Sequence, residues 1–243
     1  MFKRKCARFC LIASIKLQLN KGGKMYKETL FHGTNKDRSY EMIKTQTMLL
    51  SRGEYHWLGD GGYLFVEDLH AYKWIRDMFY SRYKKYPSSE AELSKSYFIL
   101  QVYLKVSKNR VFDLTKSEHK ILYDRVYKRL SLKRNIDSFA EGVVINYMFN
   151  ELSGYKEKYD IVKALFTLNK NKYMDSRTRL GFMPQEQICI KNNNVVQAIK
   201  KYDFSERYER FNVLLKDYYF VDNILKRKTY TKRRRFGYRR KRK

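Results

Sequence analysis

Two short runs in the first third of the chain hold residue types that bind and position small molecules. Residues 31–34 read Phe-His-Gly-Thr, so that a histidine, a glycine and a hydroxyl follow one another. Residues 58–65 read Leu-Gly-Asp-Gly-Gly-Tyr-Leu-Phe, a glycine-rich turn that leads into an apolar run. A histidine at a strand end is most often structural, and such a turn is most often a hairpin. Because the runs lie only about 30 residues apart, together they predict a site more strongly than either does alone.

Two later segments complete the candidate site. Residues 71–74 read Ala-Tyr-Lys-Trp and fall on an expected helix, where small and aromatic side chains alternate. Glu186 opens an expected strand of alternating residues near the end of the domain. The chain therefore supplies a histidine, a tyrosine, a second aromatic residue and an acid, in that order.

These segments resemble the catalytic domain of the poly(ADP-ribose) polymerase-like ADP-ribosyltransferases, the diphtheria-toxin-type branch with a His-Tyr-Glu triad. The family's His-Gly-Ser/Thr element matches residues 32–34. Its Gly-x-Gly-x-Tyr-Phe element matches residues 59–65, with Leu64 inserted relative to the usual aromatic. The family's further aromatic residue falls on Trp74, with Tyr72 as the alternative, and its strand-opening glutamate falls on Glu186. The resemblance covers residues 27–200.

The resemblance implies that NAD is the substrate. In the family, a histidine at the position of His32 binds ribose hydroxyls on the adenosine half. The backbone of Gly33 would pair with the nicotinamide carboxamide, and Thr34 would add a hydroxyl contact. The tyrosine and the later aromatic residue would hold the flat nicotinamide ring between them. The implied NAD-binding residues are His32, Gly33, Thr34, Gly62, Tyr63, Tyr72 and Trp74.

The implied catalytic residues are His32, Tyr63 and Glu186. Glu186 would hold the 2′-hydroxyl of the nicotinamide ribose, and its charge would stabilise the positive charge of the transition state. Two features depart from the family pattern. Pro184 lies two residues before Glu186, so the Glu/Gln-x-Glu signature of arginine-modifying transferases is absent. Gln187 replaces the usual aromatic residue, and a shift of one residue would put Gln187 at the catalytic position.

The sequence therefore predicts a mono-ADP-ribosyltransferase with a macromolecular acceptor, and basic residues favour nucleic acid, RNA or DNA. The resemblance also implies a bacterial or phage toxin, or an anti-phage effector, with an antitoxin protein as a further partner. Three alternatives stay open: transfer to protein, plain NAD glycohydrolysis, and a nucleic-acid-binding protein without catalysis.

An α+β domain must position these residues. The resemblance implies an ADP-ribosyltransferase fold, with split mixed β-sheets and inserted helices. Apolar and β-branched runs predict strands at residues 28–32, 63–66, 98–106, 110–114, 159–166 and 186–191. Amphipathic spacing predicts helices at residues 37–44, from residue 67 onward, and at 117–130 and 138–152, with a partly helical segment at 195–225.

Charge divides the chain into three parts. Of the net charge of +28, residues 25–225 hold only +9, and we assign them to the transferase domain. Residues 226–243 carry 12 Lys and Arg and no acid, which predicts a disordered basic tail that phosphates neutralise. Residues 1–24 carry 7 Lys and Arg and no acid, and residues 21–24 resemble a translated ribosome-binding site. We therefore hypothesise that Met25 is the true first residue.

Cysteine, histidine and hydropathy patterns bound the remaining possibilities. The chain has 3 cysteines, an odd count that makes a disulfide framework improbable. Its 4 histidines show no metal-ligand spacing, so no structural metal is expected. No run approaches the ~20 apolar residues of a membrane span. These patterns predict a cytoplasmic protein without a membrane span.

Overall fold

The computed structural model describes residues 24–53, 56–134, 140–167 and 184–216. These ranges form one seven-stranded sheet in the order β4-β5-β6-β2-β1-β3-β7. Neighbouring strands are antiparallel except for the parallel pair of β4 and β5, so the sheet is mixed. The strands are β1 (Met25–Asn35), β2 (Gly62–Phe65), β3 (Tyr97–Ser107), β4 (Val111–Asp113), β5 (Ile161–Thr167), β6 (Pro184–Ile190) and β7 (Val196–Tyr202).

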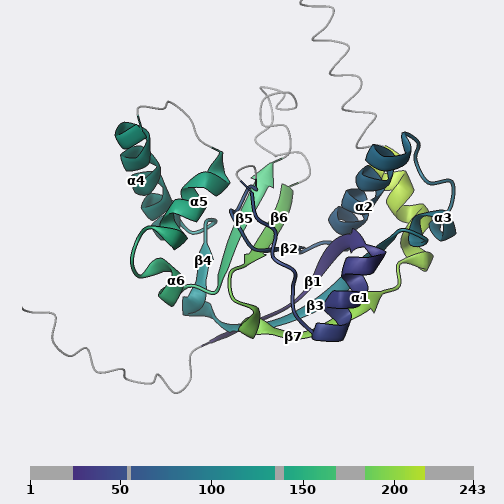
Figure 1. Ribbon diagram of the computed structural model, residues 1–243, viewed down its shortest axis with the longest axis horizontal. Helices are drawn as coiled ribbons and strands as arrows, with labels where there is room; N and C mark the ends of the chain where they lie inside the picture. Colours follow the sequence, from purple (N-terminus) through teal and green to yellow (C-terminus); the bar gives the residue numbers. More distant parts are fainter. Residues whose placement is uncertain (1–23, 54–55, 135–139, 168–183, 217–243) are drawn as a thin grey trace, which may run out of the picture.

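Helices pack at both ends of this sheet. Figure 1 shows one group beside β4 and β5 and a second group around the far ends of β1 and β3. The first group is α4 (Ser117–Arg134), α5 (Glu141–Asn150) and α6 (Tyr155–Lys158), and the second is α1 (Lys36–Thr45), α2 (Asp68–Tyr83) and α3 (Glu90–Ser94). A helical stretch over residues 208–216 packs with the second group.

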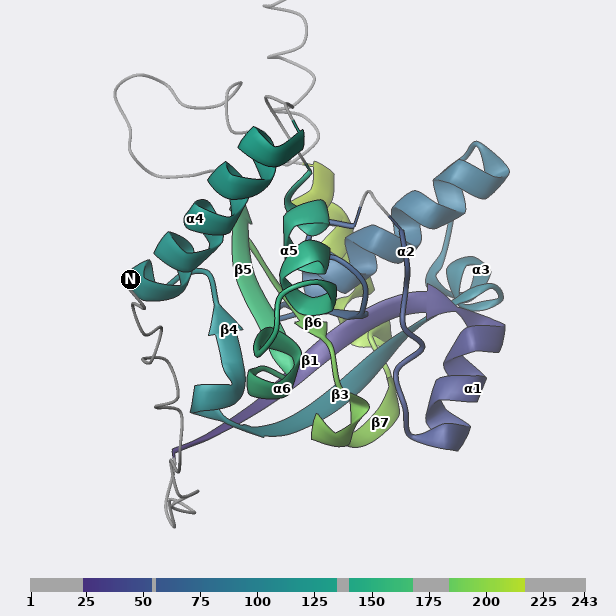
Figure 2. The same ribbon diagram turned by 60° about the vertical axis from the view of Figure 1, so that its left-hand side comes forward.

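The two longest strands, β1 and β3, pair with each other in the sheet. β1 and β3 pair over eleven residues, from Met25 opposite Ser107 to Asn35 opposite Tyr97, and run side by side across the molecule (Figure 2). The four-residue strand β2 joins this half to β6, and it registers with β1 through Phe31 and Phe65. The expected split into separate sheets is therefore not observed among the described residues, because β2 connects the two halves by hydrogen bonds.

Alternation along the strands gives the sheet two different faces. Leu64 and Ile188 join a core that also contains Met42 of α1. Tyr63 and Cys189 contact the core formed with α4 and α5. In a third core, α2 and residues 208–216 pack against the part of the sheet that contains β3. Because successive side chains of a strand point to opposite faces, neighbouring residues of β2 and of β6 lie on opposite faces of the sheet.

Most expected elements are found, with three differences. β1 continues through Gly33, which pairs with Ile99 inside the ladder, whereas the sequence suggested an end before the glycine. Residues 196–202 form strand β7, although their lysines hid the apolar alternation within a segment expected to be partly helical. The short helices α3 and α6 were not expected. Within the described ranges, no helix is both long and apolar enough to cross a bilayer.

Candidate functional site

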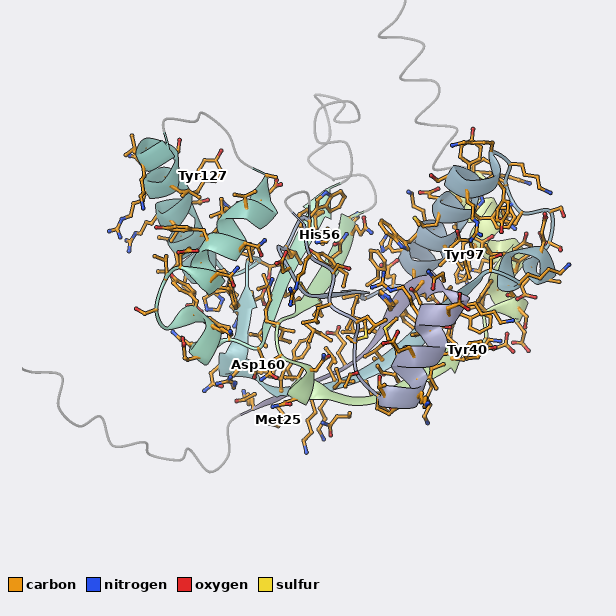
Figure 3. All side chains as sticks on the ribbon, viewed as in Figure 1. Met25, Tyr40, His56, Tyr97, Tyr127 and Asp160 are labelled. Carbon is orange, nitrogen blue, oxygen red and sulfur yellow. The ribbon has the colours of Figure 1, made fainter. Side chains whose placement is uncertain are left out.

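A cavity of about 800 Å³ lies where α2 faces the middle of the sheet. β1, β2 and β6 supply its floor, and Leu49, Ser51, His56 and Trp57 close one side. Figure 3 labels two of its lining residues, His56 near the central strands and Tyr97 beside α2. The other lining residues are His32, Gly33, Thr34, Asn35, Arg38, Leu49, Ser51, Trp57, Tyr63, Phe65, His70, Lys73, Trp74, Asp77, Met78, Ser81, Arg82, Gln185 and Gln187.

His32 lies on β1 and is fixed by the neighbouring strand. Its Nδ1 donates to the backbone oxygen of Tyr63 at 2.7 Å. Burial lowers the pKa of His32 to about 4, so the ring is neutral at neutral pH. With its proton on Nδ1, the neutral ring offers Nε2 as a hydrogen-bond acceptor. This arrangement suits a ligand that donates from a hydroxyl group.

Tyr63 lines the cavity with its ring, while its hydroxyl is used inside the protein. The hydroxyl donates to the backbone oxygen of Gly59 at 2.6 Å and accepts from the amide of Leu58 at 2.8 Å. Burial raises the pKa of Tyr63, which keeps the phenol protonated. Tyr63 therefore acts through its ring face, and its hydroxyl holds the glycine-rich turn in place.

Lys191 fixes the same turn from behind. Its Nζ donates to the backbone oxygens of Leu58 at 2.7 Å and Asp60 at 2.5 Å. Burial lowers the pKa of Lys191. Asn146 of α5 adds a hydrogen bond from the Asp60 amide at 2.7 Å. These contacts come from residues far away in sequence, which is why sequence patterns did not reveal them.

Gly33 lets α2 approach β1 closely. A Cβ at this position would lie 2.7 Å from the backbone oxygen of Ala71 and from Cγ2 of Ile75. It would also lie 3.2 Å from the ring of Trp74, which is 52% exposed and forms part of the cavity wall. Thr34, the next residue, is 9% exposed and lines the cavity as expected. The run at residues 32–34 thus contributes all three residues to one surface.

Two residues expected at the site lie elsewhere. Tyr72 is fully buried on the opposite side of α2, where its ring lies 5.0 Å from that of Phe211 and its hydroxyl donates to Asn212 at 2.8 Å. Two residues along a helix correspond to about 200°, so Tyr72 and Trp74 cannot share a face. Gly62 points away from the cavity, since a Cβ there would lie 2.9 Å from Cβ of Met48.

Glu186 is also placed outside the cavity. Its carboxylate lies on the other face of the sheet, where Nζ of Lys163 is 2.5 Å away. Gln185 and Gln187, the residues on either side of it, line the cavity instead. The reason is the two-residue period of a strand: if Gln187 faces the cavity, Glu186 cannot. Glu186, which the sequence placed in the site, therefore lies outside this cavity, and Gln187, named as the alternative, lines it.

Several lining residues were not anticipated from the sequence. His70, Lys73 and Asp77 lie on the face of α2 that also carries Trp74, at helical spacings of three and four. Lys73 donates to Asp77 at 2.6 Å. Counting helical spacings of three and four residues from Trp74 along the sequence would have identified this face of α2. His56 comes from the loop before β2, where no periodicity exists.

Some expectations fall on residues outside the described ranges. The basic tail at residues 226–243 and residues 1–23 of the basic N-terminal extension belong to this group. Among the residues that are described, no group of three or more histidine, cysteine or acidic side chains could hold a metal ion.

The chain is similar to a protein of an archaeon. The chain is 38% identical over 209 residues to the uncharacterized protein MJ0359 of Methanocaldococcus jannaschii, covering 78% of this chain and 94% of the archaeal protein. The chain belongs to the same family as this protein. No family model matches the chain, and no solved structure matches it.

Proposed function

We propose that the cavity binds NAD and that the protein transfers ADP-ribose from NAD to a macromolecule. The fold we propose for the domain is that of the poly(ADP-ribose) polymerase-like ADP-ribosyltransferases. The observation that carries this proposal is convergence: His32, Tyr63 and Gln187 come from three adjacent strands and line one cavity. The sequence motifs alone connect only His32 and Tyr63, which lie 31 residues apart.

The described side chains fit the parts of NAD. A flat nicotinamide ring would lie against the faces of Tyr63 and Trp74. Gly33 leaves its backbone accessible, so it could pair with the carboxamide without a side chain in the way. Nε2 of His32 would accept from a ribose hydroxyl. Arg38 and Arg82 line the same cavity and would neutralise the diphosphate.

The reaction breaks the bond between nicotinamide and C1′ of the ribose. The bonding electron pair leaves with nicotinamide, and the sugar develops the positive charge of an oxocarbenium ion. A nucleophile of the acceptor then forms the new bond to C1′ and releases its proton to solvent. In this scheme Gln187 holds the 2′-hydroxyl, and its neutral amide supplies orientation without the charge stabilisation that a carboxylate gives. We therefore expect slow transfer.

Nucleic acid is the acceptor that we favour. Beside the cavity, α2 and the residues that follow it carry five Lys and Arg against two acids over residues 68–86. Large side chains on the same segment are exposed, namely those of Trp74, Met78, Tyr80, Tyr83 and Tyr86. Exposed aromatic rings among positive charges are typical of surfaces that bind single-stranded nucleic acid. A protein acceptor is the alternative, and the assay below distinguishes the two.

The glutamine supports one rival function. With Gln187 in place of a carboxylate, the cavity could hold NAD without turning it over, in a protein whose basic surfaces bind nucleic acid. Asp77, the acidic residue that lines the cavity, is ion-paired with Lys73 and is not a ready substitute.

The test is incubation of the full chain with NAD labelled in the adenylate half, together with RNA, DNA or cell lysate. The proposal expects label on nucleic acid with the wild type and its loss with Gln187→Ala. Nicotinamide release without label transfer would identify a glycohydrolase. NAD binding without nicotinamide release would favour the non-catalytic rival, and no NAD binding would overturn the proposal.

A further inference from the structure

Three of the 4 histidines in the chain line the cavity. These are His32, His56 and His70. The fourth, His119, lies near the start of α4, where its Nδ1 accepts from the Asp113 amide at 2.9 Å. His32 also uses its Nδ1, through the bond to Tyr63. The other two cavity histidines differ in this respect. Nδ1 of each is buried and has no hydrogen-bond partner among the described residues.

His70 is the stronger case of the two. It lies in the first turn of α2 and is only 5% exposed, with its ring 6.2 Å from that of Phe65. Burial and the charge of Lys73 lower the pKa of His70 to about 4, so the ring is neutral. A buried polar atom without a partner is unfavourable in the folded state, and proteins rarely keep one without a reason. Because this nitrogen is buried, a ligand in the cavity would reach it only if the ring turned over, and would otherwise meet the other ring nitrogen of His70.

Sheet register relates His70 to Gln187. Phe65, against which the histidine ring lies, pairs directly with Gln187 across β2 and β6. Both His70 and Gln187 line the cavity. In the proposed reaction Gln187 holds the ribose that carries nicotinamide, so His70 lies beside the same part of the ligand.

We infer that His70 is a further ligand-binding residue, which hydrogen-bonds a hydroxyl of the ribose that carries nicotinamide. A neutral imidazole offers one N–H donor and one nitrogen acceptor, and a hydroxyl group can pair with either. Phosphate oxygens only accept and favour cationic partners, such as the arginines of the cavity. This inference rests on the proposed function. Nδ1 of His56 is likewise buried without a hydrogen-bond partner among the described residues. Because His56 directly follows residues 54–55, which are not described, the inference does not depend on it.

The first test is NMR of the full chain with ¹⁵N-labelled histidine. Four imidazoles give few signals, and comparison with His70→Phe assigns those of His70. Adding NAD to saturation should shift the ring nitrogens of His70, because a new hydrogen bond forms there. The signals of His119 should stay in place, since that residue lies outside the cavity and already has a partner.

The second test compares the affinity of three probes for the wild type and for His70→Phe. Phenylalanine preserves the flat ring but removes both nitrogens. The variant should bind NAD and ADP-ribose about 10-fold more weakly, while nicotinamide, which has no ribose, should bind as before. The matched control is His119→Phe, which should bind all three probes like the wild type.

The outcomes separate this inference from the proposed function. If the wild type binds NAD but the His70 signals do not move and His70→Phe binds NAD equally well, the inference fails and the proposed function stands. If His70→Phe does not fold, triple-resonance assignment of the wild type identifies the His70 signals, and the titration of the wild type still decides the matter. If the wild type does not bind NAD at all, both fail.

Discussion

Glu186 and Gln187 are neighbours in β6, yet their side chains belong to two very different polar groups. Glu186 joins Tyr26, Glu28 and Lys163 on one face of the sheet, a group we call the charged cluster. Gln187 lies on the other face and lines the cavity with His32 and His70, which we call the neutral cluster.

The charged cluster contains the ion pair of Lys163 with Glu186, while the hydroxyl of Tyr26 and Oε2 of Glu28 are buried without a hydrogen-bond partner among the described residues. Burial lowers the pKa of Lys163, but the hydrogen bond to Glu186 and the charges of Glu186 and Glu28 outweigh this and raise it. Burial raises the pKa of Glu28, opposed by Lys163. Lys163 pairs with Glu186 across β5 and β6 and acts on Glu28 of β1 through its charge. This cluster therefore contributes to holding the sheet together.

The neutral cluster differs from the charged cluster in carrying no ion pair of its own. Its histidines stay uncharged, and His70 keeps a buried nitrogen without a partner among the described residues. The comparison teaches that an acid next to a motif is not evidence of chemistry until its face is known. An ion pair away from the cavity indicates a role in stability, and neutral polar side chains that line the cavity indicate a role in binding.

The largest expected effect separates the two faces by activity. Gln187→Ala should lower the rate of ADP-ribose transfer by ~10²-fold, since it removes a group that orients the reacting ribose. Glu186→Gln should keep the rate within about threefold, because the carboxylate lies outside the cavity. Rates from labelled NAD, normalised to folded protein, would measure both. A larger loss of rate in Glu186→Gln than in Gln187→Ala would indicate that Glu186 is the catalytic residue.

Acid should destabilise the protein through the neutral cluster. The pKa values of His32 and His70 fall from 6.5 to about 4 on folding, so the unfolded chain binds protons in this range that the folded chain excludes. Stability is therefore lost as pH falls from 6.5 to 4, by up to ~3 kcal/mol for each histidine. Urea unfolding at several pH values would measure this loss. His70→Phe should flatten the dependence, and an unchanged slope would argue against a buried neutral His70.

Removing the cation of the charged cluster should affect stability and not binding. Lys163→Met leaves two carboxylates without their partner, which should lower the free energy of unfolding by about 2 kcal/mol, a value reduced for partial exposure. NAD affinity should not change. The matched control is Lys120→Met, which breaks an exposed pair with Asp124 and should cost at most about 0.5 kcal/mol. Equal losses in both variants would contradict a stabilising role for the cluster.

The smallest expected effect concerns the cavity wall. Trp74→Ala removes one face of the proposed nicotinamide site and should weaken NAD binding by about 10-fold, as expected for the loss of one aromatic contact. Trp74→Phe should retain most of the affinity. Calorimetric titration would measure both. If Trp74→Ala binds NAD like the wild type, the ring does not contact the ligand.

The sequence predicted much of the site because the motifs are local. His32, Gly33 and Thr34 are consecutive, and the order of strands and helices in the first half follows from apolar periodicity. Trp74 follows Tyr63 at the spacing of the family pattern, so the position of the tyrosine predicts that of the tryptophan. The sequence could not orient β6, because residues 184–190 contain polar side chains on both faces. Only pairing with β2 and β5 decides which polar side chains face the cavity.

Other features depended on contacts between distant segments. Tyr72 reads as an exposed aromatic near Trp74 until residues 208–216 pack over it. The turn before Tyr63 is held by Lys191 and Asn146, which lie far along the chain. His70 became a candidate only when its neighbours were known, since its burial and open nitrogen are properties of the folded chain.

The central claim is that the neutral cluster surrounds an NAD site, and tryptophan fluorescence tests it most directly. The chain has 2 tryptophans, Trp57 and Trp74, and both line the cavity. Titration of the wild type with NAD should therefore change the emission in a saturable manner with one site per chain. His32→Ala should lose this response, and Glu186→Gln should keep it. No saturable response in the wild type, or an equal response in His32→Ala, would contradict the account.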